Sequence, residues 1–199
     1  MHQAELPRSQ SAPDAARLNG SVLEASTPDA TARTRSYAWD DPAISAAAAR
    51  EQDGTAFLQG ILDGSLPAAP VARTLDFAPV SVEPGTVVFE FTPAEFHYNP
   101  IGSVHGGVIS TLCDSACGCA VQSLLPAGTY YTSLDLSVKF LRAVASGAGR
   151  MTCTGTVTHL GGRSALAEAR LTGTDGTLYA FATSSCLIFR PDNGVRPPG

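Results

Sequence analysis

A glycine pair and a single aspartate, within one apolar segment, are the residues of this sequence best suited to chemistry. Gly106 and Gly107 follow His105, and Asp114 lies inside the apolar run that begins at Val108. Free N–H groups at the start of a helix, with the positive end of the helix dipole, can stabilise a developing oxyanion. A carboxylate on an apolar helix is costly unless it has a partner or a chemical role. The segment therefore predicts a carbonyl-polarising group and a buried acid that orients water.

The spacing of these two groups predicts a site made by two chains. Asp114 follows Gly106 by eight residues, which span roughly 12 Å on one helix. One acyl carbonyl cannot contact both groups of the same chain. Two antiparallel helices, side by side, would bring Gly106 of one chain against Asp114 of the other. We therefore expect a homodimer, alone or as a dimer of dimers. A structural interpretation stays open, in which the glycines form a turn and the aspartate pairs with a serine.

The composition predicts a globular protein that binds neither nucleic acid nor membrane. The chain has 199 residues, a formal net charge of −5 and a pI of about 5.2, which disfavours nucleic acid and anionic lipid as main partners. Five cysteines fit a reducing compartment better than a disulfide framework, so we expect a cytoplasmic protein. We find no apolar run long enough to span a bilayer and no secretory signal. Cys113 and Cys117 have helical spacing without further ligands nearby, so no metal site is expected.

Patterns along the chain predict an extension, one domain and a tail. Residues 1–35 are rich in Ser, Ala, Pro and Thr without periodicity, and read as a disordered extension. Residues 36–190 carry the periodic segments, and residues 191–199 read as a loop. One long apolar helix among several strands favours the α+β class, with the helix wrapped by a curved antiparallel sheet.

Local signals place the elements of this domain. An N-terminal helical segment begins at Pro42, with Asp41 as N-cap, breaks at Gly54 and ends at Asp63-Gly64. The pattern changes to strand type from Arg73, and the long helix is expected over residues 106–124. Strands are expected on both sides of the 83–85 turn, and further along the chain at residues 130–142, 150–160, 164–173 and 177–189.

Four sequence blocks together resemble the hotdog-fold acyl-CoA thioesterases, in particular those of the phenylacetate-pathway (PaaI-like) type. The blocks are residues 97–107, 112–115, 131–142 and 161–164, and they occur in the family's order and spacing. The resemblance covers about residues 42 to 190 and names the α+β architecture a hotdog. One departure is Ala143, where the family usually has proline.

The resemblance implies an enzyme that hydrolyses an acyl-CoA to the free acid and coenzyme A, without a separate cofactor. Asp114 would activate water as a general base or attack the thioester to give an anhydride, and both courses stay open. The Gly106 amide would polarise the carbonyl. Asn99 would donate an N–H to the carbonyl oxygen, and His105 would hold the Asn99 side chain or contact the acyl oxygen. Ser133 resembles the hydroxyl that positions water.

A second group of residues is expected to bind the coenzyme. Arg142 and Arg163 are candidates for its phosphates, and the Gly161-Gly162 amides could form an anion nest with the Ser164 hydroxyl. Asp135 is expected on the same strand face as Ser133. By resemblance, the pantetheine channel would be lined by Phe140, Leu141 and Ala143.

Two other functions remain as alternatives. A hotdog hydratase or dehydratase would pair a histidine with an acid on one reacting carbon. Here the acid lies on the helix where thioesterases carry it. A dimer that binds acyl-CoA without catalysis is the second alternative, and the Asn99, His105, Gly106 and Asp114 set disfavours it by resemblance only.

Overall fold

The computed structural model describes residues 32–145 and 147–190, and residues from Ser36 onward belong to one compact unit. Residues 1–31 of the predicted extension, and the predicted tail of residues 191–199, lie outside the described residues. Three short helices open the domain: α1 (Pro42–Glu51), α2 (Gly54–Asp63) and α3 (Pro70–Leu75). In the described part of the chain, no helix combines the length and the apolar character needed to cross a membrane.

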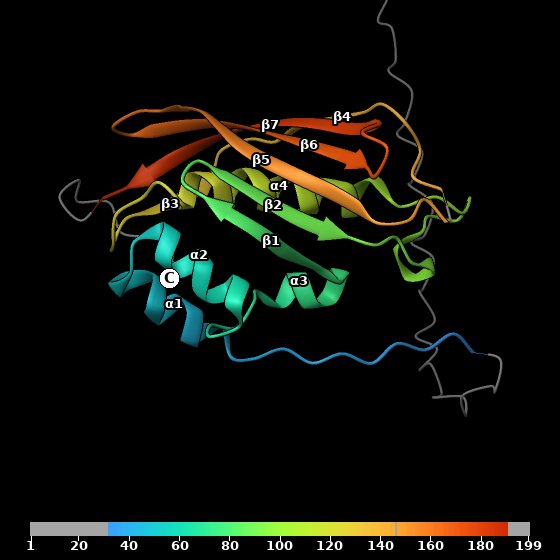
Figure 1. Ribbon diagram of the computed structural model, residues 1–199, viewed down its shortest axis with the longest axis horizontal. Coiled ribbons are helices and arrows are strands. Elements are labelled where there is room, and N and C mark those ends of the chain that lie inside the picture. The colour runs from blue at the N-terminus through green and yellow to red at the C-terminus, as the bar shows by residue number, and fades with distance from the viewer. Residues whose placement is uncertain (1–31, 146, 191–199) are drawn as a thin grey trace, which may run out of the picture. The chain divides into compact units, whose positions relative to one another are not determined.

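Seven strands form one antiparallel sheet that wraps the long helix α4 (Gly106–Gln122). The strands are β1 (Phe77–Glu83), β2 (Thr86–Phe91), β3 (Tyr130–Ser133), β4 (Ser137–Phe140), β5 (Met151–Leu160), β6 (Ser164–Gly173) and β7 (Leu178–Phe189). Their order is β1-β2-β5-β6-β7-β3, and β4 also pairs with β7. Helix α4 packs against one face of this sheet (Figure 1). The structure therefore confirms the predicted α+β class.

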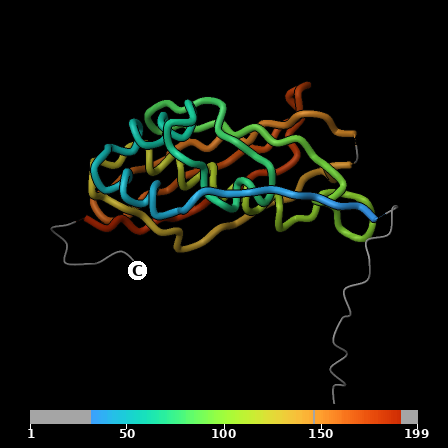
Figure 2. The backbone as a smooth tube through the Cα atoms, turned by 90° about the horizontal axis from the view of Figure 1, so that it is seen from below, coloured from blue at the N-terminus to red at the C-terminus, as the bar shows by residue number. Residues whose placement is uncertain are grey.

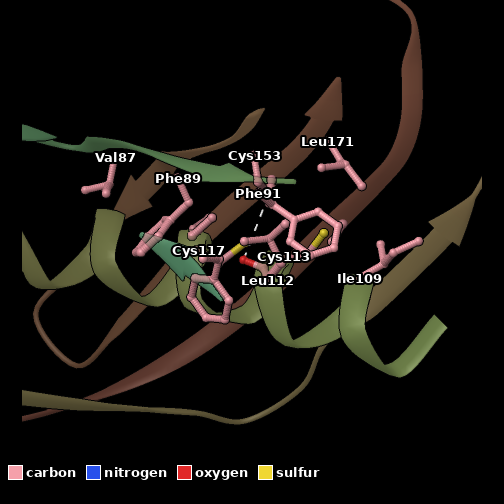
Figure 3. Packing of buried hydrophobic residues seen from close by; sticks show 14 of the residues in the cluster. Val87, Phe89, Phe91, Ile109, Leu112, Cys113, Cys117, Cys153 and Leu171 are labelled. Atoms are coloured by element: carbon pink, nitrogen blue, oxygen red, sulfur yellow. Dashed lines mark hydrogen bonds between the residues drawn. The ribbon is translucent and has the colours of Figure 1, made fainter. Parts of the chain in front are cut away.

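Small side chains let α4 approach the sheet closely. A Cβ atom at Gly155 of β5 would collide with the α4 backbone at Ala116 and Cys117, so this position requires glycine. Figure 3 shows Phe89 and Phe91 of β2, with Leu171 of β6, beside α4 in the buried cluster. The middle strands β6 and β7 present only alanines over much of this contact, at Ala165, Ala167, Ala169, Ala180 and Ala182, all buried.

The N-terminal helices are attached to the end of α4 and to β1. The Gly54 N–H donates to the Leu125 carbonyl at 2.8 Å, and the Thr55 hydroxyl donates to the Ser123 carbonyl at 2.7 Å. Asp41 and Asp53 cap α1 and α2, each accepting a backbone N–H at 2.9 Å. The first cap and the break at Gly54 confirm the prediction. The tube of Figure 2 shows the α1–α3 segment in cyan and green.

Two predictions of local structure were wrong. Helix α3 covers Pro70–Leu75, where the sequence indicated a change to strand from Arg73. The strand expected over residues 130–142 is broken into β3 and β4, which lie end to end along β7. Asp135 causes the break, because its Oδ1 accepts the Ser185 N–H at 3.1 Å and its carbonyl accepts the Ser184 hydroxyl at 2.8 Å.

Candidate active site

The start of α4 presents one free backbone donor. His105 is the N-cap residue, and its Nδ1 accepts the Gly107 N–H at 2.9 Å. The Gly106 N–H has no acceptor among the residues that the structure describes. His105 therefore holds the helix start rather than the Asn99 side chain, which corrects one of its two predicted roles. The cap leaves Gly106 as the amide able to meet a ligand oxygen.

Asn99 organises the loop that leads to α4. Its Nδ2 donates to the Ser103 hydroxyl at 2.9 Å, and its Oδ1 accepts the N–H groups of Ile101 at 3.1 Å and Ser103 at 3.2 Å. One N–H of the amide remains for a ligand. Ser103 was not predicted to have a role, although it lies within the block that resembles the thioesterases.

An open groove of about 360 Å³ brings Gly106 together with the residues predicted for the coenzyme channel. A Cβ atom at Gly106 would lie 3.1 Å from the Phe140 ring, so glycine lets this ring pack against the start of the helix. We call this the amide groove; it is lined by Val104, Gly106, Ile109, Phe140, Leu141, Arg142, Ala143 and Val144.

Asp114 and Ser133 form the second part of the site, which we call the acid pair. The Ser133 hydroxyl donates to Asp114 Oδ1 at 3.0 Å. Asp114 is half-buried and Ser133 is exposed, so the acid is more accessible than the apolar run predicted. The contact leaves Asp114 Oδ2 open to another donor, and the two residues predicted to cooperate lie within hydrogen-bond distance.

A second contact runs parallel to the acid pair. The Tyr131 hydroxyl lies against α4 where a Cβ atom at Gly118 would be. Tyr131 and Ser133 are two residues apart on β3, about 6.6 Å, and Gly118 and Asp114 are four residues apart on α4, about 6 Å. The matching spacings keep β3 aligned with the helix, so that Ser133 lies over Asp114. The sequence analysis missed this pair, although a glycine inside a helix signals close packing.

Two buried groups near Asp114, Cys119 and Tyr131, have raised pKa values. Burial, reinforced by the Asp114 carboxylate, raises the pKa of the Cys119 thiol to about 12. Burial also raises the pKa of Tyr131 well above its usual value, with smaller contributions from Cys119, Cys186 and Asp114. Among the described residues, no group of three or more potential ligands is arranged to hold a metal ion. The Cys119 thiol is therefore not ionised at neutral pH and does not act as a nucleophile beside Asp114.

The amide groove and the acid pair lie at different positions along β7. Phe140 pairs with Ala180, whereas Ser133 pairs with Cys186. Six residues of strand span about 20 Å. The geometry of α4 gives the same result. The helix is unbroken from Gly106 past Asp114, so these two residues are about 12 Å apart along its axis. Within one chain the two parts are therefore too far apart for one carbonyl.

The two arginines predicted to bind phosphate, Arg142 and Arg163, also lie at different positions along β7. The Arg142 N–H donates to the Tyr179 carbonyl at 3.1 Å, and the Arg163 carbonyl accepts the Ile188 N–H at 2.9 Å. Nine residues of β7 separate these attachment points, or about 30 Å. Arg142 belongs to the amide groove, and Arg163 lies at the same end of β7 as the acid pair. Both side chains are exposed.

Two predicted coenzyme contacts have other roles. Asp135 lies in the break after β3, so strand alternation does not place it beside Ser133, and its Oδ1 is bonded to the β7 backbone. The Gly161 N–H donates to the Ser164 carbonyl at 2.8 Å within the hairpin. Gly161 therefore cannot contribute to an anion nest, whereas Gly162 and the side chains of Arg163 and Ser164 are exposed.

The segment that carries most of these residues is similar to known proteins. The model of the thioesterase superfamily matches residues 101–180, from the loop before α4 to the start of β7. A candidate esterase of Halobacterium salinarum is 32% identical over 99 residues, which are 46% of this chain. The match spans 64% of that relative's length.

Solved structures show the same fold. A candidate thioesterase of Ralstonia eutropha, related to phenylacetic acid degradation, has a TM-score of 0.60 at 26% identity, covering 65% of this chain and 98% of that one. The PaaI protein of the E. coli phenylacetic acid degradation operon has a TM-score of 0.57 at 22% identity, covering 61% and 86%. A Streptococcus mutans protein bound to acetyl-CoA has a TM-score of 0.52 at 26% identity, covering 57% and 88%. Sequence and fold together show that this chain has a hotdog fold and that its segment 101–180 is similar to the thioesterase superfamily.

Proposed function

We propose that this protein hydrolyses acyl-CoA thioesters. The observation that carries the proposal is the unpartnered Gly106 amide at the start of the same helix that holds the Ser133-bonded Asp114. An amide at a helix start can stabilise the oxyanion of thioester hydrolysis, and a carboxylate with one free oxygen can act as its general base. The acetyl-CoA bound to the S. mutans protein supports coenzyme A as the carrier.

The chemistry follows from these two groups. Asp114 Oδ2 takes a proton from water as the water oxygen bonds to the thioester carbon. The carbonyl oxygen becomes an oxyanion that accepts the Gly106 N–H and faces the positive end of the α4 dipole. The C–S bond then breaks, and the coenzyme thiolate leaves and takes up the proton. Ser133 holds Asp114 in place through Oδ1.

The site is completed by a second copy of the chain. Residues 130–140 form an edge of the sheet with unpaired backbone groups, which favour pairing with another strand. This edge and its continuation carry apolar side chains that are more than half exposed: Leu134 at 61%, and Phe140 and Leu141 at 54% each. A two-fold axis at this edge would set the amide groove of one chain against the acid pair of the other.

Steady-state hydrolysis by the wild type and by Asp114→Asn tests the reaction. Thiol release from a panel of acyl-CoA esters measures kcat. We expect kcat of Asp114→Asn to be lower than that of the wild type by about 10²-fold or more, because asparagine has the shape of aspartate but cannot take a proton from water. Single turnover in H₂¹⁸O should leave Asp114 unlabelled. Label in its carboxylate would favour the anhydride route, and near-normal turnover by a folded Asp114→Asn protein would exclude Asp114 as the base.

Mixed dimers test the two-chain site. Gly106→Pro removes the free amide at a position where proline fits a helix start, and the preceding His105 has the extended ψ of 136° that proline requires. A purified heterodimer of Gly106→Pro and Asp114→Asn chains contains one intact site if the site is shared. It should recover about half of the wild-type rate, since one of the two composite sites is intact. Verified heterodimers without activity would show that each site uses one chain.

A further inference from the structure

A narrow apolar slot lies between the N-terminal helices and α4. It has a volume of about 80 Å³. Leu58 and Ile61 of α2 and Ala72 of α3 line one side, and Phe77 and Phe89 of the sheet line another. Ser115 and Cys119 of α4 complete the slot, and Ser115 is its one hydroxyl-bearing lining residue. A slot of this composition suits a hydrocarbon chain.

A larger groove borders the slot on its outer side. A groove of about 400 Å³ shares five lining residues with it: Ile61, Ala68, Ala72, Phe77 and Pro79. The outer groove also contacts polar side chains, among them Asp76, Glu90 and Thr92. The slot and the outer groove therefore lie side by side, and a chain that passed between the shared residues would have room beyond the narrow part.

The α4 side of the slot is one residue along the helix from Asp114 of the acid pair. Ser115 directly follows Asp114 on α4, and Cys119 lies one turn further along the same side of the helix. The Asp114 charge acts on Cys119, so the carboxylate is within electrostatic reach of the slot. A thioester carbonyl placed beside Asp114 would direct its acyl chain toward this entrance.

We propose that this slot, between α2–α3 and α4, binds the acyl chain of the substrate and selects unbranched aliphatic chains over aromatic ones. The proposal rests on the proposed thioesterase function. The volume of the slot determines which class of acyl chain it accepts. It measures about 80 Å³, whereas an apolar cavity that holds benzene measures about 150 Å³. A linear chain passes through into the outer groove, whereas an aryl ring attached close to the carbonyl does not fit.

Chain-length profiles test the slot. Wild-type kcat/KM on saturated acyl-CoA esters should rise about fourfold per added methylene while the chain fills the slot. Octanoyl-CoA should exceed benzoyl-CoA and phenylacetyl-CoA by at least tenfold. Ala68→Leu, at a half-buried position outside the helices, should lower the octanoyl-to-acetyl ratio at least tenfold. Ile61→Ala widens the slot and should raise the relative rate on phenylacetyl-CoA.

A matched control separates slot filling from a general effect of added bulk. Ala56 is exposed on α2 and does not line the slot, so Ala56→Leu should keep the wild-type profile. An Ala68→Leu profile equal to that of Ala56→Leu, or an aryl preference in the wild type, would overturn the proposal.

Binding distinguishes failure of the slot from failure of the proposed function. The affinity ratio of octanoyl-CoA to acetyl-CoA, measured by calorimetry on the Asp114→Asn protein, reports the chain contribution without turnover. This affinity ratio should fall at least tenfold when Ala68→Leu is added to Asp114→Asn. It should stay unchanged when Ala56→Leu is added instead. If the wild type does not hydrolyse acyl-CoA but the affinity ratios follow this pattern, the proposed thioesterase function is wrong and the acyl-chain slot is supported. A ratio near one, or one unaffected by Ala68→Leu, would refute the slot even if hydrolysis occurs.

Discussion

The amide groove and the acid pair present their reactive groups by opposite means. In the groove, the group that acts on the carbonyl is a backbone N–H, and the side chains next to it shape the wall. In the acid pair, both groups are side chains, and their meeting depends on the alignment of β3 with α4. The groove should therefore tolerate side-chain changes that keep the amide, whereas the acid pair should be sensitive to small shifts of the strand.

Removing the amide should give the largest effect of this comparison. Gly106→Pro deletes the N–H, and loss of one oxyanion donor costs about 10²- to 10³-fold in kcat. Gly106→Ala keeps the N–H and adds the same Cβ atom, 3.1 Å from the Phe140 ring, so it measures crowding alone. Initial rates on one acyl-CoA compare the two variants. If both variants lose the same activity, the loss comes from crowding of the groove wall at Gly106 and not from removal of the N–H.

Shifting the strand should have a smaller effect, which acts through the acid pair. Gly118→Ala places a methyl group against the Tyr131 hydroxyl, so β3 must move away from α4 and carry Ser133 with it. We expect about a tenfold fall in kcat with little change in KM, and a stability loss of about 1–3 kcal/mol from overpacking.

A shorter side chain at residue 131 provides the control for this prediction. Tyr131→Leu in the Gly118→Ala background removes the obstruction and should restore part of kcat. Lower stability with an unchanged kcat in Gly118→Ala would show that Ser133 needs no alignment by Tyr131.

The same contrast explains which features could be predicted from the sequence. Helix α4, the cap at Asp41 and the break at Gly54 follow from period and capping, which are local. The break between β3 and β4 could not be predicted, because it depends on bonds from Asp135 to residues about fifty positions later. Helix α3 also begins with a proline, but it has only six residues and lacks the side-chain cap that marked α1.

In the site, residue types were easier to predict than partners. The resemblance paired Asp114 with Ser133 in function, and the structure brings them into contact. It did not predict that His105 would cap Gly107 or that Asn99 would bind Ser103. These partners are set by the path of the 99–105 loop, which periodicity does not describe. The distance between Arg142 and Arg163 likewise depends on the pairing of β7 with its neighbours.

The two arginines give the smallest expected effect and extend the comparison to the coenzyme. Arg142 lies in the amide groove and Arg163 near the acid pair of the same chain, so a shared site would draw them from different subunits. Phosphates lie far from the reacting carbonyl, so either contact stabilises the bound ground state and transition state alike. Arg142→Ala and Arg163→Ala should each raise KM by roughly threefold to tenfold, with little change in kcat.

Arg150→Ala is the matched control, because Arg150 is also exposed but pairs with Glu90 at 3.3 Å, away from both parts of the site. It should leave KM unchanged. Added salt should weaken wild-type binding more than binding by the Arg142 and Arg163 variants, since exposed ion pairs are screened. A short thioester without the nucleotide should not distinguish them from wild type. If Arg163→Ala instead lowers kcat for one acyl group only, its side chain contacts the acyl chain, and the phosphate assignment is wrong for that half of the site.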